Sequence, residues 1–164
     1  MAVVALDPKG THAKFCAESP IFAADSVWHD EQHRDGAASP SRANAPVLLR
    51  AWAQKLLLAL DQFAALYPDD PRASSVLYRA GYLLYSHNQF SESAVRFRRV
   101  IAKDGWTEET EQAANLTLDG LLLSEDWAGL RDTAKAFYDQ PGFGSSAFKA
   151  EMLEIVERAG AKLP

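Results

Sequence analysis

The stretch AGYLLYSHNQFSESAVRF, residues 80–97, decides the fold of this chain. Large apolar residues recur at three- and four-residue spacing on both sides of the polar segment 86–89. Such spacing predicts two amphipathic helices, and the short polar segment predicts the turn between them. Two helices joined by so short a turn pack antiparallel to one another. The stretch therefore predicts a helical hairpin, which serves either a catalytic site or a surface that holds another protein.

The same spacing predicts helices along most of the chain. Pro46 can open a helix at its first turn. Thr107 can cap another, although Thr110 stands where the reciprocal Glu of a capping box is usual. Gly160 is expected to close the last helix in a left-handed conformation. No segment alternates as a strand does, so we expect an all-α fold of about seven helices: residues 21–33, 47–67, 74–85, 90–102, 107–123, 127–138 and 146–159.

The hairpin is repeated further along the chain. A shift of 37 residues superposes residues 80–97 on residues 117–134, so that Asn88 meets Glu125 and Phe90 meets Trp127. Asp104-Gly105 and Pro141-Gly142 end the two units. A period in the thirties built from helical hairpins is typical of a solenoid, in which each unit buries its apolar faces against its neighbours.

These residues resemble the tetratricopeptide repeat (TPR) family, and the preceding LYPDDPRA is most similar to the repeats of bacterial envelope proteins. Some positions depart from the family pattern: Ser93 replaces Ala, Leu118 replaces Gly, and Gly105 and Gly142 replace the closing Pro. Leu118 predicts looser packing in the second unit, because Gly permits close backbone approach. The likeness rests on Ala80-Gly81, Leu84-Tyr85, Asn88-Gln89-Phe90, Ala94 and Phe97.

The resemblance implies TPR-like antiparallel helical hairpins in a short right-handed solenoid with a C-terminal capping helix. The cap is expected to bury Phe148, Met152 and Ile155, with Lys149, Glu151, Glu154, Glu157 and Arg158 on its other side. We expect a poorly ordered segment over residues 1–19, because Pro8 and Gly10 interrupt it, and a helix plus flexible linker over 20–45. The repeat domain would then span residues 46–164, as a half repeat (46–67), two repeats (72–104 and 107–140) and the cap (145–160).

In this family the first helix of each pair lines a concave groove. The resemblance thus implies that one helix contributes Ser75, Tyr78, Tyr82 and Tyr85 to a partner-binding groove, and that the next contributes Gln112, Asn115, Asp119 and Leu122. The clamp with which some members hold acidic C-termini is absent, because Tyr82 and Asp119 occupy its position.

The three tyrosines also have a physical reason to act together. Tyr78, Tyr82 and Tyr85 lie at positions i, i+4 and i+7, so their rings share one helical face. Tyrosine combines a rigid apolar ring with a hydroxyl group and is favoured at binding surfaces. Alternatively the rings fill space between helices, while Asn115 and Asp119 are simply solvated.

Composition excludes some classes of function. The net charge is −5, with 17 Lys and Arg against 22 Asp and Glu, which disfavours nucleic-acid binding. Cys16 is the single cysteine, so no intrachain disulfide forms. No apolar run is long enough to span a membrane, and the first ten residues lack the features of a signal peptide. We expect a cytoplasmic chain, or a piece of a longer protein of the bacterial periplasm or envelope.

Two motifs suggest chemistry. His29 and His33 of HDEQH share a helical face and can chelate zinc with His12, Cys16 or Asp35 as a third ligand, but the order of residues is not HExxH, and solvated histidines are the alternative. Ser145 and Ser146 follow GFG, which is not a GxSxG elbow, and helix capping explains them.

The sequence therefore predicts a non-catalytic scaffold for protein–protein interaction, which binds a partner segment in a groove and requires no cofactor. One alternative is a structural subunit of a larger assembly, with the groove filled by its own N-terminal residues. Another is a metal-dependent enzyme at His29 and His33.

Overall fold

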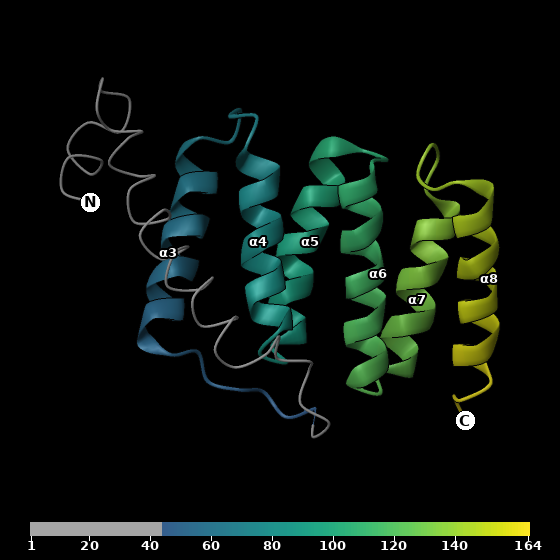
Figure 1. Cartoon of the computed structure of the whole chain (residues 1–164). Helices are drawn as coiled ribbons and strands as arrows, with labels where there is room; N and C mark the ends of the chain where they lie inside the picture. The colour runs from purple at the N-terminus through teal and green to yellow at the C-terminus, as the bar shows by residue number, and fades with distance from the viewer. Residues whose placement is uncertain (1–43) are drawn as a thin grey trace. The chain divides into compact units, whose positions relative to one another are not determined.

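The computed structural model describes residues 44–164. Within this range the chain forms six helices and no strand, which confirms the predicted all-α class (Figure 1). The predicted segment 1–19 and the helix expected over residues 21–33 lie outside the described residues. The helices are α3 (Ala51–Leu66), α4 (Ala73–Tyr85), α5 (Phe90–Asp104), α6 (Glu108–Leu123), α7 (Trp127–Asp139) and α8 (Ser146–Gly160).

These helices belong to two compact units. Unit 1 ends at Gln89 and contains α3 and α4, whereas unit 2 runs from Phe90 to Pro164 and contains α5 to α8. In unit 1, α3 packs on α4, and each helix buries apolar side chains at helical spacing. These side chains are Leu56, Leu60 and Phe63 on α3, and Leu77, Ala80 and Leu84 on α4.

The residues ahead of α3 are not helical, so the prediction that Pro46 opens the helix is wrong. We call residues 44–50 the strap. The Val47 N–H donates to the His87 carbonyl at 2.8 Å, and the Asn88 side chain donates through Nδ2 to the Ala45 carbonyl at 3.0 Å. Gln89 Nε2 donates to the Val47 carbonyl at 2.8 Å. These bonds hold the strap against the turn that follows α4, and α3 begins only at Ala51.

The turns after α4 and α6 share one backbone geometry. Asn88 and Glu125, which the 37-residue shift superposes, have φ angles of 56° and 57°. The Gln89 N–H donates to the Leu84 carbonyl at 3.0 Å, and the Asp126 N–H donates to the Leu121 carbonyl at the same distance. Gly105 and Gly142 also superpose, with φ angles of 66° and 71°. The sequence period therefore recurs in local backbone conformation.

The start of α6 differs from the prediction in one respect. The Thr110 N–H donates to Thr107 Oγ1 at 3.2 Å, and the Thr107 N–H donates to Thr110 Oγ1 at 2.8 Å. Thr110 thus supplies the reciprocal bond that was expected to be missing for want of a Glu. A short hydroxyl side chain completes the capping box.

In unit 2, α5 packs on α6, and α7 packs on α8. An aromatic cluster joins the α7–α8 pair to Trp106, whose ring centroid lies 5.0 Å from those of both Phe143 and Phe148. Contacts between α6 and α7 are less extensive than those that either helix makes with its other neighbour. Leu118 was predicted to loosen this region, and it lines a pocket there.

The end of α8 also departs from expectation. Gly160 lies within the helix, and Ala161, in a right-handed conformation, follows as its C-cap. The left-handed cap predicted at Gly160 is therefore wrong.

Candidate functional site

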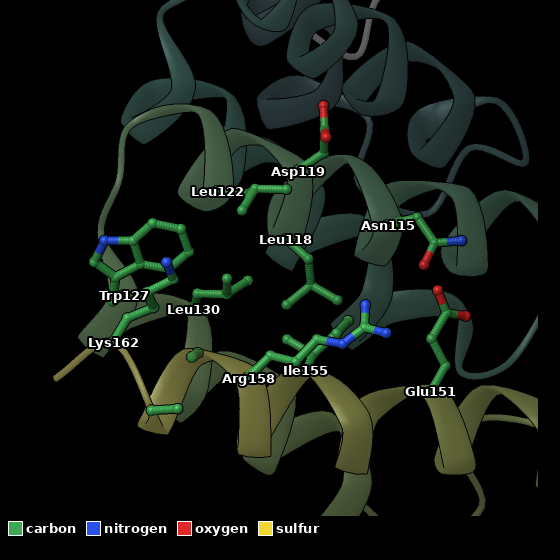
Figure 2. Close-up of a pocket in the computed structure, with 12 residues that line it drawn as sticks. Asn115, Leu118, Asp119, Leu122, Trp127, Leu130, Glu151, Ile155, Arg158 and Lys162 are labelled. Atoms are coloured by element: carbon green, nitrogen blue, oxygen red, sulfur yellow. The ribbon is translucent and has the colours of Figure 1, made fainter.

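A pocket with a volume of about 670 Å³ opens in unit 2 between α6, α7 and α8 (Figure 2). We call it the trough. Asn115, Leu118, Asp119 and Leu122 line it from α6, Trp127 and Leu130 from α7, and Glu151, Ile155, Arg158, Ala159, Ala161 and Lys162 from α8 and the turn that follows it. Pockets of this size are typical of ligand and peptide sites.

Helical periodicity places the lining residues. On α6, Asn115, Leu118 and Leu122 lie at positions i, i+3 and i+7, so they share a face. At the other wall, Glu151, Ile155, Arg158 and Lys162 lie at positions i, i+4, i+7 and i+11. Lys162 keeps this register although α8 ends at Gly160, because the chain makes a further turn in which the Lys162 N–H donates to the Ala159 carbonyl at 3.1 Å.

Two lysines fix α8 antiparallel to α7. Lys149, near the start of α8, donates through Nζ to the carbonyls of Phe137, Tyr138 and Gln140 where α7 ends. A cation at a helix C-terminus satisfies unpaired carbonyls and opposes the negative end of the helix dipole. At the opposite end, Lys162 Nζ lies 5.7 Å from the centroid of the Trp127 ring. The α7–α8 side of the trough is thus held at both ends.

The floor of the trough is apolar. Leu118 and Leu130 are 4% and 5% exposed, whereas Leu122 is 45% exposed and offers apolar surface to a ligand. In Figure 2 the side chains of Leu118 on α6, Leu130 on α7 and Ile155 on α8 extend into the space between these helices. None of the lining residues is Ser, Thr, Cys, His or Tyr. The trough therefore offers apolar area together with the charged side chains of Asp119, Glu151, Arg158 and Lys162.

The two ends of the trough differ in charge. Asn115 and Glu151 lie at one end, and Trp127 and Lys162 lie at the other (Figure 2). Arg158 also lies on the α8 wall, where its Nη2 is 3.5 Å from Glu154 Oε2 in an exposed ion pair. Exposed pairs of this kind contribute little to stability, so Arg158 can still interact with a ligand.

The predicted groove residues fall into both units. On α6, Asn115, Asp119 and Leu122 line the trough, whereas Gln112 is exposed and is not among the lining residues. The other four belong to α4 in unit 1: Ser75, Tyr78, Tyr82 and Tyr85.

On α4 the three tyrosines are unequally exposed. Tyr82 is 36% exposed and Tyr85 is 8% exposed, while Tyr78 is half-buried. The rings of Tyr82 and Tyr85 stack with their centroids 6.4 Å apart, so these two residues share a face as predicted. Burial lowers the pKa of the neighbouring Arg79 side chain from its ordinary value.

Sequence reasoning missed most of the α7 and α8 contributions. Glu151 and Arg158 were expected on the side of α8 opposite Ile155, but they line the trough together with it. Lys149 was expected to face water, and it binds the end of α7 instead. The helical spacing of Glu151, Ile155, Arg158 and Lys162 could have indicated that they share a face. Lys162, however, lies beyond the end of α8, so the sequence did not suggest it as a member of this face.

Among residues 44–164, no three His, Cys, Asp or Glu side chains come close enough to hold a metal ion, and His29 and His33 lie outside this range. No helix in the described part of the chain is both long and apolar enough to cross a membrane.

No protein-family model, curated protein sequence or solved structure matches this chain. The function proposed below therefore rests on the geometry of the trough.

Proposed function

We propose that this chain is a non-catalytic scaffold that binds a segment of another protein in the trough. The observation that carries the proposal is the apolar floor of a 670 Å³ pocket whose rim holds charged side chains of both signs. Burying one aliphatic side chain of a partner contributes about 1.5–3 kcal/mol. Two or three such side chains contribute about 3–9 kcal/mol before the entropic cost of association is subtracted, so charged contacts at the rim must add to the affinity.

We also propose an architecture for the helices. The helical hairpins form TPR-like repeats in a short right-handed solenoid, and α8 acts as its C-terminal cap. The shared turn geometry at Asn88 and Glu125 supports this, as does the left-handed glycine at both Gly105 and Gly142. In such an array α8 lies beyond the last repeat and covers its apolar side, consistent with the burial of Phe148 and Met152.

A matched pair of leucines tests the binding site. Leu122 lines the trough and is 45% exposed, while Leu153 on α8 is 44% exposed and is not among the lining residues. Peptides are first selected for binding to the whole chain from a displayed library, and their affinities are then measured calorimetrically. Leu122→Ala should weaken binding about 5- to 30-fold, as truncation of a central contact does. Leu153→Ala should leave it unchanged. Failure to select any peptide, or equal losses in both variants, would contradict the proposal.

A second candidate function, a structural subunit of a larger assembly, is favoured by unit 1. Its exposed large apolar side chains include Val47 and Leu48 in the strap, and Leu58 and Leu66 on α3. Leu48 and Leu58 are 90% and 57% exposed, and exposed apolar surface is typical of subunit interfaces. If this function holds, Leu58→Asp should reduce the mass of the particle in analytical ultracentrifugation. A wild-type chain that sediments as a monomer at all concentrations would exclude self-assembly through this helix.

A further inference from the structure

We propose that the segment bound in the trough is an amphipathic α-helix of about three turns that carries opposite charges at its two ends. This inference rests on the proposed scaffold function and specifies the chemistry of the partner. It follows from the apolar floor, the length of the trough and the distribution of charge along its rim.

The apolar floor favours a helix over an extended peptide. Leu118, Leu122, Leu130 and Ile155 form the surface on which the segment would lie, and none of their side chains can form hydrogen bonds. An extended backbone pressed on this floor would lose its bonds to water and leave N–H and C=O groups unpaired, which is costly. A helix satisfies its own backbone and can present an apolar stripe to a hydrophobic groove.

The wall formed by α8 sets the length of the segment. From Glu151 to Lys162 it rises through eleven residues of helical register, which corresponds to about 16 Å. About three turns of a bound helix cover this distance, and three turns place apolar residues at i, i+3 or i+4, and i+7 against the floor.

The charged residues at the rim of the trough determine which charges the bound helix should carry. At the Asn115 end the charged group of the α8 wall is Glu151, so a basic side chain of the bound helix is favoured there. Lys162 lies at the Trp127 end, so an acidic side chain is favoured there. The Arg158 guanidinium extends from the α8 wall toward Glu151, between the two ends (Figure 2). The Asp119 carboxylate on the α6 wall points away from the floor (Figure 2).

Three synthetic peptides test the inference with the whole chain. Each has about 14 residues and the same leucine stripe, and they differ only in their end charges: one acidic and one basic end, two acidic ends, or two basic ends. At low ionic strength the bipolar peptide should bind tightest, by about three- to tenfold, since each exposed complementary contact changes affinity roughly one- to fivefold. Circular dichroism should show that the peptide gains helix on binding.

A charge reversal makes the test specific to the rim. Glu151→Lys gives the trough cations at both ends, so the preference should move to the peptide with two acidic ends. Glu157→Lys makes the same change in net charge on an exposed part of α8 that is not among the lining residues, and it should preserve the preference for the bipolar peptide.

The outcomes separate this inference from the proposed function. Equal binding of the three peptides to the wild type, or binding without a gain of helix, overturns the inference and leaves the scaffold function standing. A Glu157→Lys variant that changes its preference as Glu151→Lys does also overturns it, because the effect then comes from net charge. If none of the peptides binds at about 1 mM, a concentration at which even weak complexes form, the inference falls. Selection from the displayed library then decides the scaffold function by itself.

Discussion

Asn88 and Glu125 have nearly the same backbone conformation, with φ angles of 56° and 57°, but their side chains differ in what they do. The Asn88 side chain is buried and donates to the Ala45 carbonyl of the strap. Glu125 is exposed in the turn before α7. A left-handed conformation is unfavourable for a residue with a Cβ atom, least so for Asn. In the turn after α4 the side-chain hydrogen bond of Asn88 offsets this strain, whereas the Glu125 side chain extends into solvent.

Glycine substitutions at these two positions should have opposite effects. Glu125→Gly relieves the backbone strain and should raise the free energy of unfolding by about 0.5–1 kcal/mol. Asn88→Gly also relaxes the backbone but removes the bond to Ala45, so it should lower the free energy of unfolding by about 1 kcal/mol. Urea denaturation measures both. Changes of the same sign would show that the side-chain bond of Asn88 does not contribute.

Lys149 should contribute far more to stability than a typical surface lysine does. Its Nζ donates to three carbonyls at the end of α7, and Lys149→Met leaves those carbonyls without their cation. The expected loss is about 1–2 kcal/mol in the free energy of unfolding. Lys135→Met is the control, because Lys135 forms only an exposed pair with Asp139, and it should change the melting temperature little. If the two variants have the same melting temperature, Lys149 does not hold α8 to α7.

At the scale of elements, α6 depends on the reciprocal bonds between Thr107 and Thr110. Thr110→Val keeps the shape of this fully buried side chain but removes its hydroxyl, so the Thr107 N–H loses its acceptor. We expect the free energy of unfolding to fall by about 1 kcal/mol, within the range of other helix caps. Thermal unfolding followed by circular dichroism measures this. A neutral substitution would mean that water replaces the Thr110 hydroxyl at no cost.

Most helix limits could be predicted because they are local. The apolar spacing and polar turns placed both ends of α5, α6 and α7 within two residues of the structure. The start of α3 could not be predicted in this way, since it depends on bonds between the strap and residues 87–89, forty or more positions away. No local pattern contains that information, and Pro46 is equally compatible with an extended strap.

The candidate site was predictable only on α6. The resemblance to a repeat family assigned a face of this helix to a groove, and Asn115, Asp119 and Leu122 line the trough on that face. The α8 wall was assigned to the wrong side, because Ile155 is the single apolar residue between Glu151 and Arg158 on the helical face that they share. Two charged residues beside one apolar residue are typical of a solvated face as well as of the rim of a binding site.

At the scale of the whole molecule, α8 both completes the trough and covers apolar surface of unit 2. Deletion of residues 145–164 removes Phe148 from the cluster with Trp106, Phe137 and Phe143. The shortened chain should melt at a lower temperature and aggregate, because these rings become exposed. Size-exclusion chromatography and a melting curve measure this. A soluble, monomeric product with unchanged melting would remove the capping role proposed for α8.

The strap has a further consequence for the stability of unit 1. The Val47 amide lies outside every helix, yet it donates to the His87 carbonyl across 40 residues of sequence. Its hydrogen should therefore exchange with deuterium as slowly as the helical amides of α3 and α4, whereas an unbonded amide in an exposed segment exchanges rapidly. Hydrogen exchange at this one position then reports whether the strap and the two helices of unit 1 open in a single step.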